Sequence, residues 1–124
     1  MNETLLALVE ETTCAAALTC SAETVRQLGL KPQEFWYAST RQVWGHILRM
    51  ETPSIVLLMD ADADLAVSAQ AWLGRDEGVH NHPAGLRAHA ALVKREARIR
   101  AIGQGNAQQI NELRAGTHGD WWER

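Results

Sequence analysis

The sequence has few of the residues that stabilise small secreted or membrane-bound proteins. Only two cysteines, Cys14 and Cys20, occur in 124 residues, and their spacing fits neither a disulfide framework nor a metal site. The longest apolar run, residues 55–59, is far too short to cross a bilayer. Glu3 stands where a signal peptide would need positive charge. We therefore expect a cytoplasmic protein with reduced cysteines and no membrane contact.

The sequence also lacks the common signatures of enzymes and the strong positive charge of many nucleic-acid-binding proteins. It contains no glycine-rich phosphate loop and no Gly-x-Ser-x-Gly nucleophile motif. The net charge is −3, from 12 basic and 15 acidic residues, which gives the whole chain no electrostatic preference for DNA. We therefore predict a non-catalytic protein that needs no cofactor and binds DNA weakly or not at all.

The chain does contain a succession of amphipathic segments, which predict an all-α fold with a small helical head over residues 1–83. Helix starts and stops are supplied by residues such as Ser21, a typical N-cap, and Gly29, a typical stop. Helices are predicted over 4–18, 22–28, 39–50, 54–59 and 65–73, with one turn begun by Pro32 and a polar loop over 75–83. The predicted core of the head is Phe35, Trp36, Val43, Trp44 and Ile47.

The longest segment, 84–116, predicts a protruding amphipathic helix that begins a helical hairpin. A helix of about thirty residues is roughly 45 Å long, which is more than the head could cover. We therefore expect part of its apolar face to meet another chain. We expect the paired tryptophans of a stub over 117–124 either to pack back on the core or to contact a partner or a missing continuation. The predicted interface residues are Leu86, Val93, Ile99, Ile102, Ile110, Leu113, Trp121 and Trp122. Gly103 and Gly105 weaken the helix, and we predict that it continues through them.

The opposite face of the same segment is basic. Five of the 12 basic residues fall within residues 87–100, namely Arg87, Lys94, Arg95, Arg98 and Arg100. We interpret this face mainly as solvated or as turned toward another subunit. A DNA-binding role for it stays open as an alternative.

Two short motifs invite a metal-site interpretation. Asp60-x-Asp62-x-Asp64 has the alternating carboxylates of a calcium loop but lacks its glycine and its final glutamate, so helix capping by Asp62 or Asp64 is the preferred interpretation. His80 and His82 could supply imidazoles to zinc, yet no second pair of ligands accompanies them. Solvated histidines are therefore preferred, and a small metal-dependent enzyme is the third and weakest hypothesis.

The order of motifs resembles the N-terminal domain of replicative DNA helicases of the DnaB type. The matching segments are 11–16 in the first helix, the capped helix 21–28, Pro32-Gln33-Glu34-Phe35-Trp36, Thr40-Arg41-Gln42-Val43-Trp44 and residues 89–100 of the long helix. The resemblance covers about residues 5–116. Thr40 replaces the family's histidine, and 51–83 lacks the family's Gly-Gly-Tyr-Leu-like run.

The resemblance implies a collar domain that supports assembly of a hexameric helicase and receives primase or loader proteins in a primosome. The family's ATPase domain is absent from this sequence, so no unwinding activity is implied for it. We therefore predict a self-associating interaction domain of the replication machinery, either a helicase fragment or a stand-alone relative. The alternative is a phage-type regulator that binds helicase or DNA through the basic face.

Overall fold

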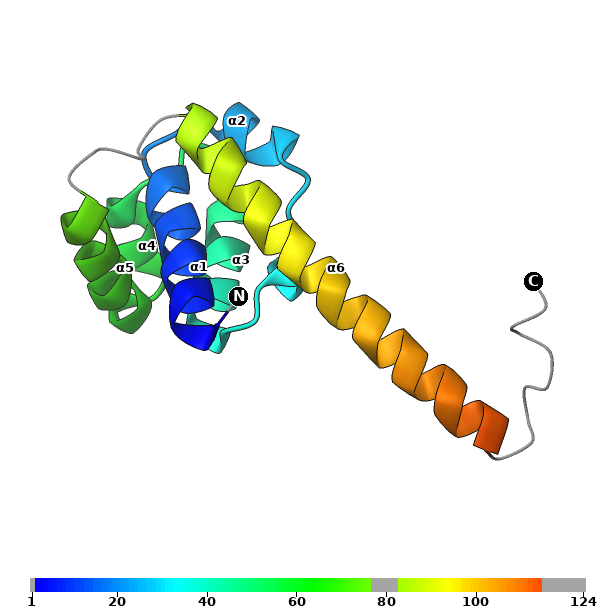
Figure 1. Cartoon of the computed structure of the whole chain (residues 1–124). Helices are drawn as coiled ribbons and strands as arrows, with labels where there is room; N and C mark the ends of the chain where they lie inside the picture. Colours follow the sequence, from blue (N-terminus) through cyan, green and yellow to red (C-terminus); the bar gives the residue numbers. More distant parts are fainter. Residues whose placement is uncertain (1, 77–82, 115–124) are drawn as a thin grey trace.

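The chain folds into a helical head from which one long helix extends (Figure 1). The computed structural model describes residues 2–76 and 83–114, with side chains described through residue 75 and over 83–103. All regular structure in these ranges is helical, which confirms the predicted all-α class. The elements are α1 (Glu3–Ala17), α2 (Ala22–Gln27), the 3₁₀ turn η1 (Pro32–Glu34), α3 (Ala38–Arg49), α4 (Ile55–Ala61), α5 (Ala63–Asp76) and α6 (Pro83–Arg114).

Local sequence signals account for several of the helix ends. The hydroxyl of Ser21 accepts a hydrogen bond from the backbone N–H of Thr24 at 3.2 Å and so caps α2. Ser54 caps α4 in the same way, and the carboxylate of Asp62 accepts from the N–H of Leu65 at 3.1 Å at the start of α5. Gly29 follows α2 with a φ of 62°, a left-handed conformation that favours glycine. The capping interpretation of Asp62 is therefore confirmed.

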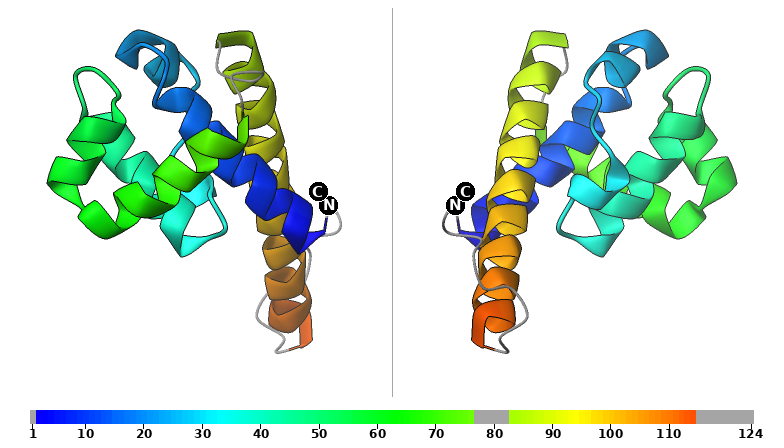
Figure 2. Two further views of the ribbon diagram at one scale, coloured as in Figure 1. Left: turned by 90° about the vertical axis from the view of Figure 1, so that its left-hand side faces the viewer. Right: turned by 90° about the vertical axis from the view of Figure 1, so that its right-hand side faces the viewer.

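The core lies where α1 packs against α3, α5 and the first part of α6 (Figure 2). The last turn of α1 is fully buried and consists of small residues, which lets neighbouring helices approach closely. Four of the five predicted core residues are buried, namely Phe35, Val43, Trp44 and Ile47. The rings of Phe35 and Trp44 lie 5.3 Å apart, and the indole N–H of Trp44 donates to the carbonyl of Leu30 at 2.8 Å.

Trp36 was wrongly predicted as a core residue, because 48% of its surface is exposed. Its backbone N–H donates to the carboxylate of Glu10 at 2.7 Å, which fixes the turn so that Phe35 enters the core. The guanidinium of Arg100 lies 5.2 Å from the centroid of the Trp36 ring. A cation–π contact with a charged group favours a position at the surface, where that group stays hydrated.

The first part of α6 belongs to the head. Leu86, Ala90 and Val93 are buried in the same core as α1, so the predicted division of the chain after residue 83 does not separate two units of packing. Leu86 and Val93 were wrongly predicted as interface residues with other chains, because both are buried in the core, where the small residues of α1 let α6 pack closely. The helix continues through Gly103 and Gly105 to Arg114, as predicted.

The other predicted interface residues divide into two groups. Ile99 and Ile102 are 55% and 57% exposed. Ile110 and Leu113 lie in α6 beyond the described side chains, and Trp121 and Trp122 lie outside the described residues. In the described part of the chain, no helix is both long enough and apolar enough to span a membrane.

Candidate functional site

The chemically most unusual group is the carboxylate of Glu10, which is fully buried at the N-terminus of α3. It accepts hydrogen bonds from the backbone N–H groups of Trp36 at 2.7 Å and Tyr37 at 3.1 Å, and from the hydroxyl of Thr40 at 2.6 Å. Tyr37 stands at the N-cap of α3 without a side-chain cap of its own. The positive end of a helix stabilises an anion at this place. Glu10 therefore holds the two residues before α3, and the Thr40 side chain in its first turn, against α1, and its oxygens are occupied by structural partners.

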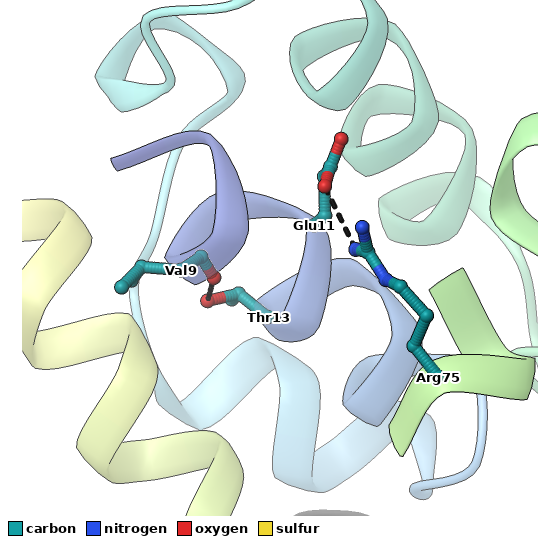
Figure 3. A network of polar contacts seen from close by, with 4 residues as sticks. All are labelled: Val9, Glu11, Thr13 and Arg75. Atoms are coloured by element: carbon teal, nitrogen blue, oxygen red, sulfur yellow. Dashed lines mark hydrogen bonds and ion pairs between the residues drawn. The ribbon is translucent and has the colours of Figure 1, made fainter. Parts of the chain in front are cut away.

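Sequence reasoning missed this role of Glu10. A signal was present, because Glu10 lies at helical spacing from Leu6, Thr13 and Cys14, all of which are buried in α1. A charged residue on the apolar side of a helix is expected to be buried, and its charge then needs a hydrogen-bond partner inside the protein. The neighbouring Glu11 points to the other side and forms an ion pair with Arg75 of α5 at 2.7 Å (Figure 3).

Cys14 lies one turn beyond Glu10 and is fully buried. Its thiol donates to the carbonyl of Thr40 at 3.6 Å. Burial raises the pKa of the Cys14 thiol well above its ordinary range, and the charges of Glu10 and Glu11 raise it further. A thiolate is needed for nucleophilic attack, so this environment keeps Cys14 in its unreactive form.

An open groove of about 690 Å³ lies between α6 and residues 29–36. We call it the basic groove, because its lining includes the five cations Lys31, Arg41, Lys94, Arg98 and Arg100. Trp36 also lines it, together with the single acidic residue Glu34. The arrangement combines a strong positive charge with an exposed aromatic ring.

Three of the groove cations are held by carbonyl groups of the head. Arg100 donates to the carbonyl of Glu34 at 2.8 Å, and Arg41 donates to that of Phe35 at 3.0 Å. Lys94 donates to the carbonyl of Leu28 just after α2, where the helix dipole favours a cation. The prediction of a mainly solvated or subunit-facing basic face does not hold for Lys94 and Arg100, which fasten α6 to the head.

The other basic residues between positions 87 and 100 are exposed. Arg98 lines the groove and makes no hydrogen bond or ion pair with other described residues. Arg95 lies 3.7 Å from Glu96 of the same helix, and Arg87 lies three turns before Arg98, outside the groove lining. The structure thus adds Lys31 and Arg41 to the predicted basic set and leaves Arg87 and Arg95 apart from it. Residues 66 positions apart meet here, which helical periodicity alone does not reveal.

A second surface lies on α4 and the beginning of α5, and we call it the acidic apolar surface. It exposes Val56, Leu57, Met59, Asp60, Asp64 and Val67, with Val56 at 67% and Val67 at 72%. Of the large residues in the predicted apolar run 55–59, Leu58 is fully buried. Residues 51–74 contain four acidic residues and no lysine or arginine. The surface therefore combines exposed apolar side chains with charge of one sign.

Metal-ligating side chains do not gather in the described ranges, where no group of three or more histidine, cysteine or acidic residues could hold an ion. Asp60 and Asp64 are exposed on either side of the capping residue Asp62. His80 and His82 lie outside the described residues.

Comparison with known proteins adds no relative. No family model, no curated protein and no solved structure matches the chain.

Proposed function

We propose that this chain is a non-catalytic assembly domain that associates with other protein chains through the outward side of α6. The supporting observation is the position of Ile99 and Ile102. At about 100° per residue, Ile102 lies half a turn around the helix from Val93, which faces the core. Ile99 and Ile102 are one turn apart and both more than half exposed. We call these two residues the outward stripe.

An outward apolar stripe on a projecting helix is the usual site of helix–helix association. Residues three and four positions apart are neighbours on a helix surface, so Ile99 and Ile102 present one continuous apolar strip. Covering such a strip with a partner helix removes apolar area from water, at about 25 cal/mol per Å². Arg100 is the last residue of α6 with a hydrogen bond to the head among the described side chains. We therefore infer that a partner chain covers the outward stripe.

We further propose that the partners are a second copy of the chain and proteins of a replicative helicase assembly, such as the helicase ring, primase or a loader. The motif order shared with the DnaB-type collar domain supports this choice. The residues that carry the resemblance stand together in the fold, because Phe35 and Trp44 pack on each other and Arg100 contacts Trp36.

Sedimentation velocity over a range up to high micromolar concentration tests the assembly role. The unchanged chain should self-associate, and a double variant with Ile99→Ser and Ile102→Ser should sediment as a monomer with an unchanged circular dichroism spectrum. Leu5→Ser with Leu8→Ser, two exposed leucines of α1, is the matched control and should leave association unchanged. A chain that stays monomeric at high micromolar concentration and binds neither purified helicase nor primase would contradict the proposal.

A second candidate function is binding of single-stranded nucleic acid in the basic groove. It is favoured by the exposed ring of Trp36 beside several cations, because bases stack on aromatic rings while phosphates pair with lysine and arginine. The net charge of −3 opposes it. Titration of tryptophan fluorescence with single- and double-stranded DNA at several salt concentrations decides the matter. Phosphate-driven binding must weaken steeply with salt, and its absence removes this candidate.

A further inference from the structure

We propose that two copies of this chain dock head to tail, with the acidic apolar surface of one copy seated on the basic groove and outward stripe of the next. The proposal rests on the assembly role given above and names the surface that occupies the groove. The two surfaces carry opposite charge, both expose apolar side chains, and they lie apart on the same molecule.

The charges of the two surfaces are opposite. The basic groove holds five cations, of which Lys31, Arg41 and Arg98 are exposed. The acidic apolar surface exposes Asp60 and Asp64, and no basic residue occurs anywhere between residues 51 and 74. Opposite potentials guide the encounter of two proteins and fix their register, while like charges exclude wrong pairings.

The apolar contents also match. Val56 and Met59 are one turn apart on α4, and both expose more than half of their surface. On the other side, Arg98 and Ile102 are neighbours at a spacing of four residues, so the rim of the groove continues into the outward stripe. An apolar patch with charged residues around it is the usual composition of a protein–protein interface.

The two surfaces cannot meet within one chain. α4 and the start of α5 lie on the side of the head away from α6 (Figures 1 and 2). A contact between different surfaces of identical copies is heterologous, so a docked pair still offers one free surface of each kind. Such contacts generate either a closed ring or a filament, depending on the rotation between neighbours.

A second copy explains more of the molecule than nucleic acid does. DNA or RNA would neutralise the groove but would leave the acidic apolar surface uncovered and repelled. A second copy covers the exposed valines and Met59 of α4 and α5 and the groove cations at the same time. It also accounts for strong local charge of both signs in a chain with a net charge of only −3.

The test is a pair of charge reversals, each of which blocks one surface. Arg98→Glu reverses a groove cation, and Asp64→Lys reverses a charge on the other surface. Both residues are exposed and make no hydrogen bond or ion pair with other described residues, so neither change should unfold the head. Each variant alone should lose self-association by at least about tenfold in dissociation constant. Their equimolar mixture should associate again, at least to a dimer, because the intact groove of one variant can bind the intact acidic apolar surface of the other.

Matched controls carry the same charge changes elsewhere. Arg87→Glu lies on the same side of α6 as Arg98, three turns nearer its start. Glu23→Lys removes an exposed acidic residue from the first turn of α2, as Asp64→Lys does in α5. Both should associate like the unchanged chain in sedimentation velocity and in native mass spectrometry. Met59→Ser, which changes no charge, should weaken association as well and serves if a charge reversal disturbs folding.

The outcomes separate this inference from the proposed function. If the unchanged chain is a monomer and binds no partner, the assembly role itself fails. If the chain associates but Arg98→Glu and Asp64→Lys associate equally well, the assembly role stands and head-to-tail docking is overturned. Docking is also overturned if both variants are monomeric and their mixture stays monomeric, or if Arg98→Glu abolishes only salt-sensitive DNA binding.

Discussion

The two apolar stripes of α6 have the same kinds of residue and opposite surroundings. The inward stripe, Leu86, Ala90 and Val93, is buried against α1 and belongs to the core. The outward stripe, Ile99 and Ile102, is more than half exposed on the other side of the helix. The contrast shows that one helix can serve two purposes, because its inward stripe completes the head and its outward stripe remains for a partner.

Truncation of one residue in each stripe should give two very different losses of stability. Leu86→Ala removes fully buried methyl groups and should lower the free energy of unfolding by about 2–5 kcal/mol. Ile102→Ala removes exposed ones and should change it by less than about 0.5 kcal/mol. Urea denaturation followed by circular dichroism measures both. Equal losses for the two variants would show that the stripes do not differ as described.

A second change separates folding from association. Glu10→Ala leaves the N–H groups of Trp36 and Tyr37 and the hydroxyl of Thr40 without their acceptor, and should cost about 2–3 kcal/mol of stability. Below its melting temperature the variant should still associate through the outward stripe. Thermal unfolding and sedimentation of the same sample test the two halves of this statement. Glu10→Gln keeps one carbonyl acceptor and should lose less stability. An unchanged melting temperature for Glu10→Ala would show that the hydrogen bonds to Glu10 do not stabilise the head.

The stability of the head should also depend weakly on pH. The raised pKa of Cys14 means that the folded chain keeps this proton at pH values where the unfolded chain releases it. Stability is therefore unaffected below the ordinary thiol pKa of about 8.5 and falls above it, by at most about 1.4 kcal/mol per pH unit. Urea midpoints between neutral pH and about pH 10 measure the slope.

The two cysteines provide the control for that slope. Cys14→Ala should remove this part of the decline. The pKa of Cys20, a partly exposed residue, is also raised, chiefly by partial burial, so Cys20→Ala should remove less of the decline. Equal slopes for Cys14→Ala and the unchanged chain would contradict the assignment.

Much of the fold was predictable because its signals are local. Ser21, Gly29, Pro32 and Asp62 fix helix ends through their own side chains or backbone preferences, and these ends lie within a few residues of their predicted positions. The continuity of α6 through Gly103 was predictable for a similar reason, since each helical glycine costs only about 1 kcal/mol.

The tertiary features were harder to predict, because they depend on which surface covers which residue. Periodicity placed Leu86 and Ile102 on one broad apolar face and could not show that α1 covers only the first of them. Trp36 was predicted to lie in the core because its side chain is aromatic. In the structure, the hydrogen bond from its backbone N–H to the carboxylate of Glu10 sets the direction of the turn. Lys31 and Arg41 join the groove through packing of distant segments, which leaves no trace in the spacing of residues.

The hydrogen bonds between Glu10 and the start of α3 also affect how the chain folds. Its partners lie 26 to 30 residues further along the chain, so the start of α3 is stabilised only once α1 has docked. Tyr37 itself offers no side-chain cap, so without that contact the N–H groups of Trp36 and Tyr37 lose their side-chain acceptor. Formation of α3 is thereby coupled to a long-range contact, which favours a single cooperative transition in which secondary and tertiary structure appear together.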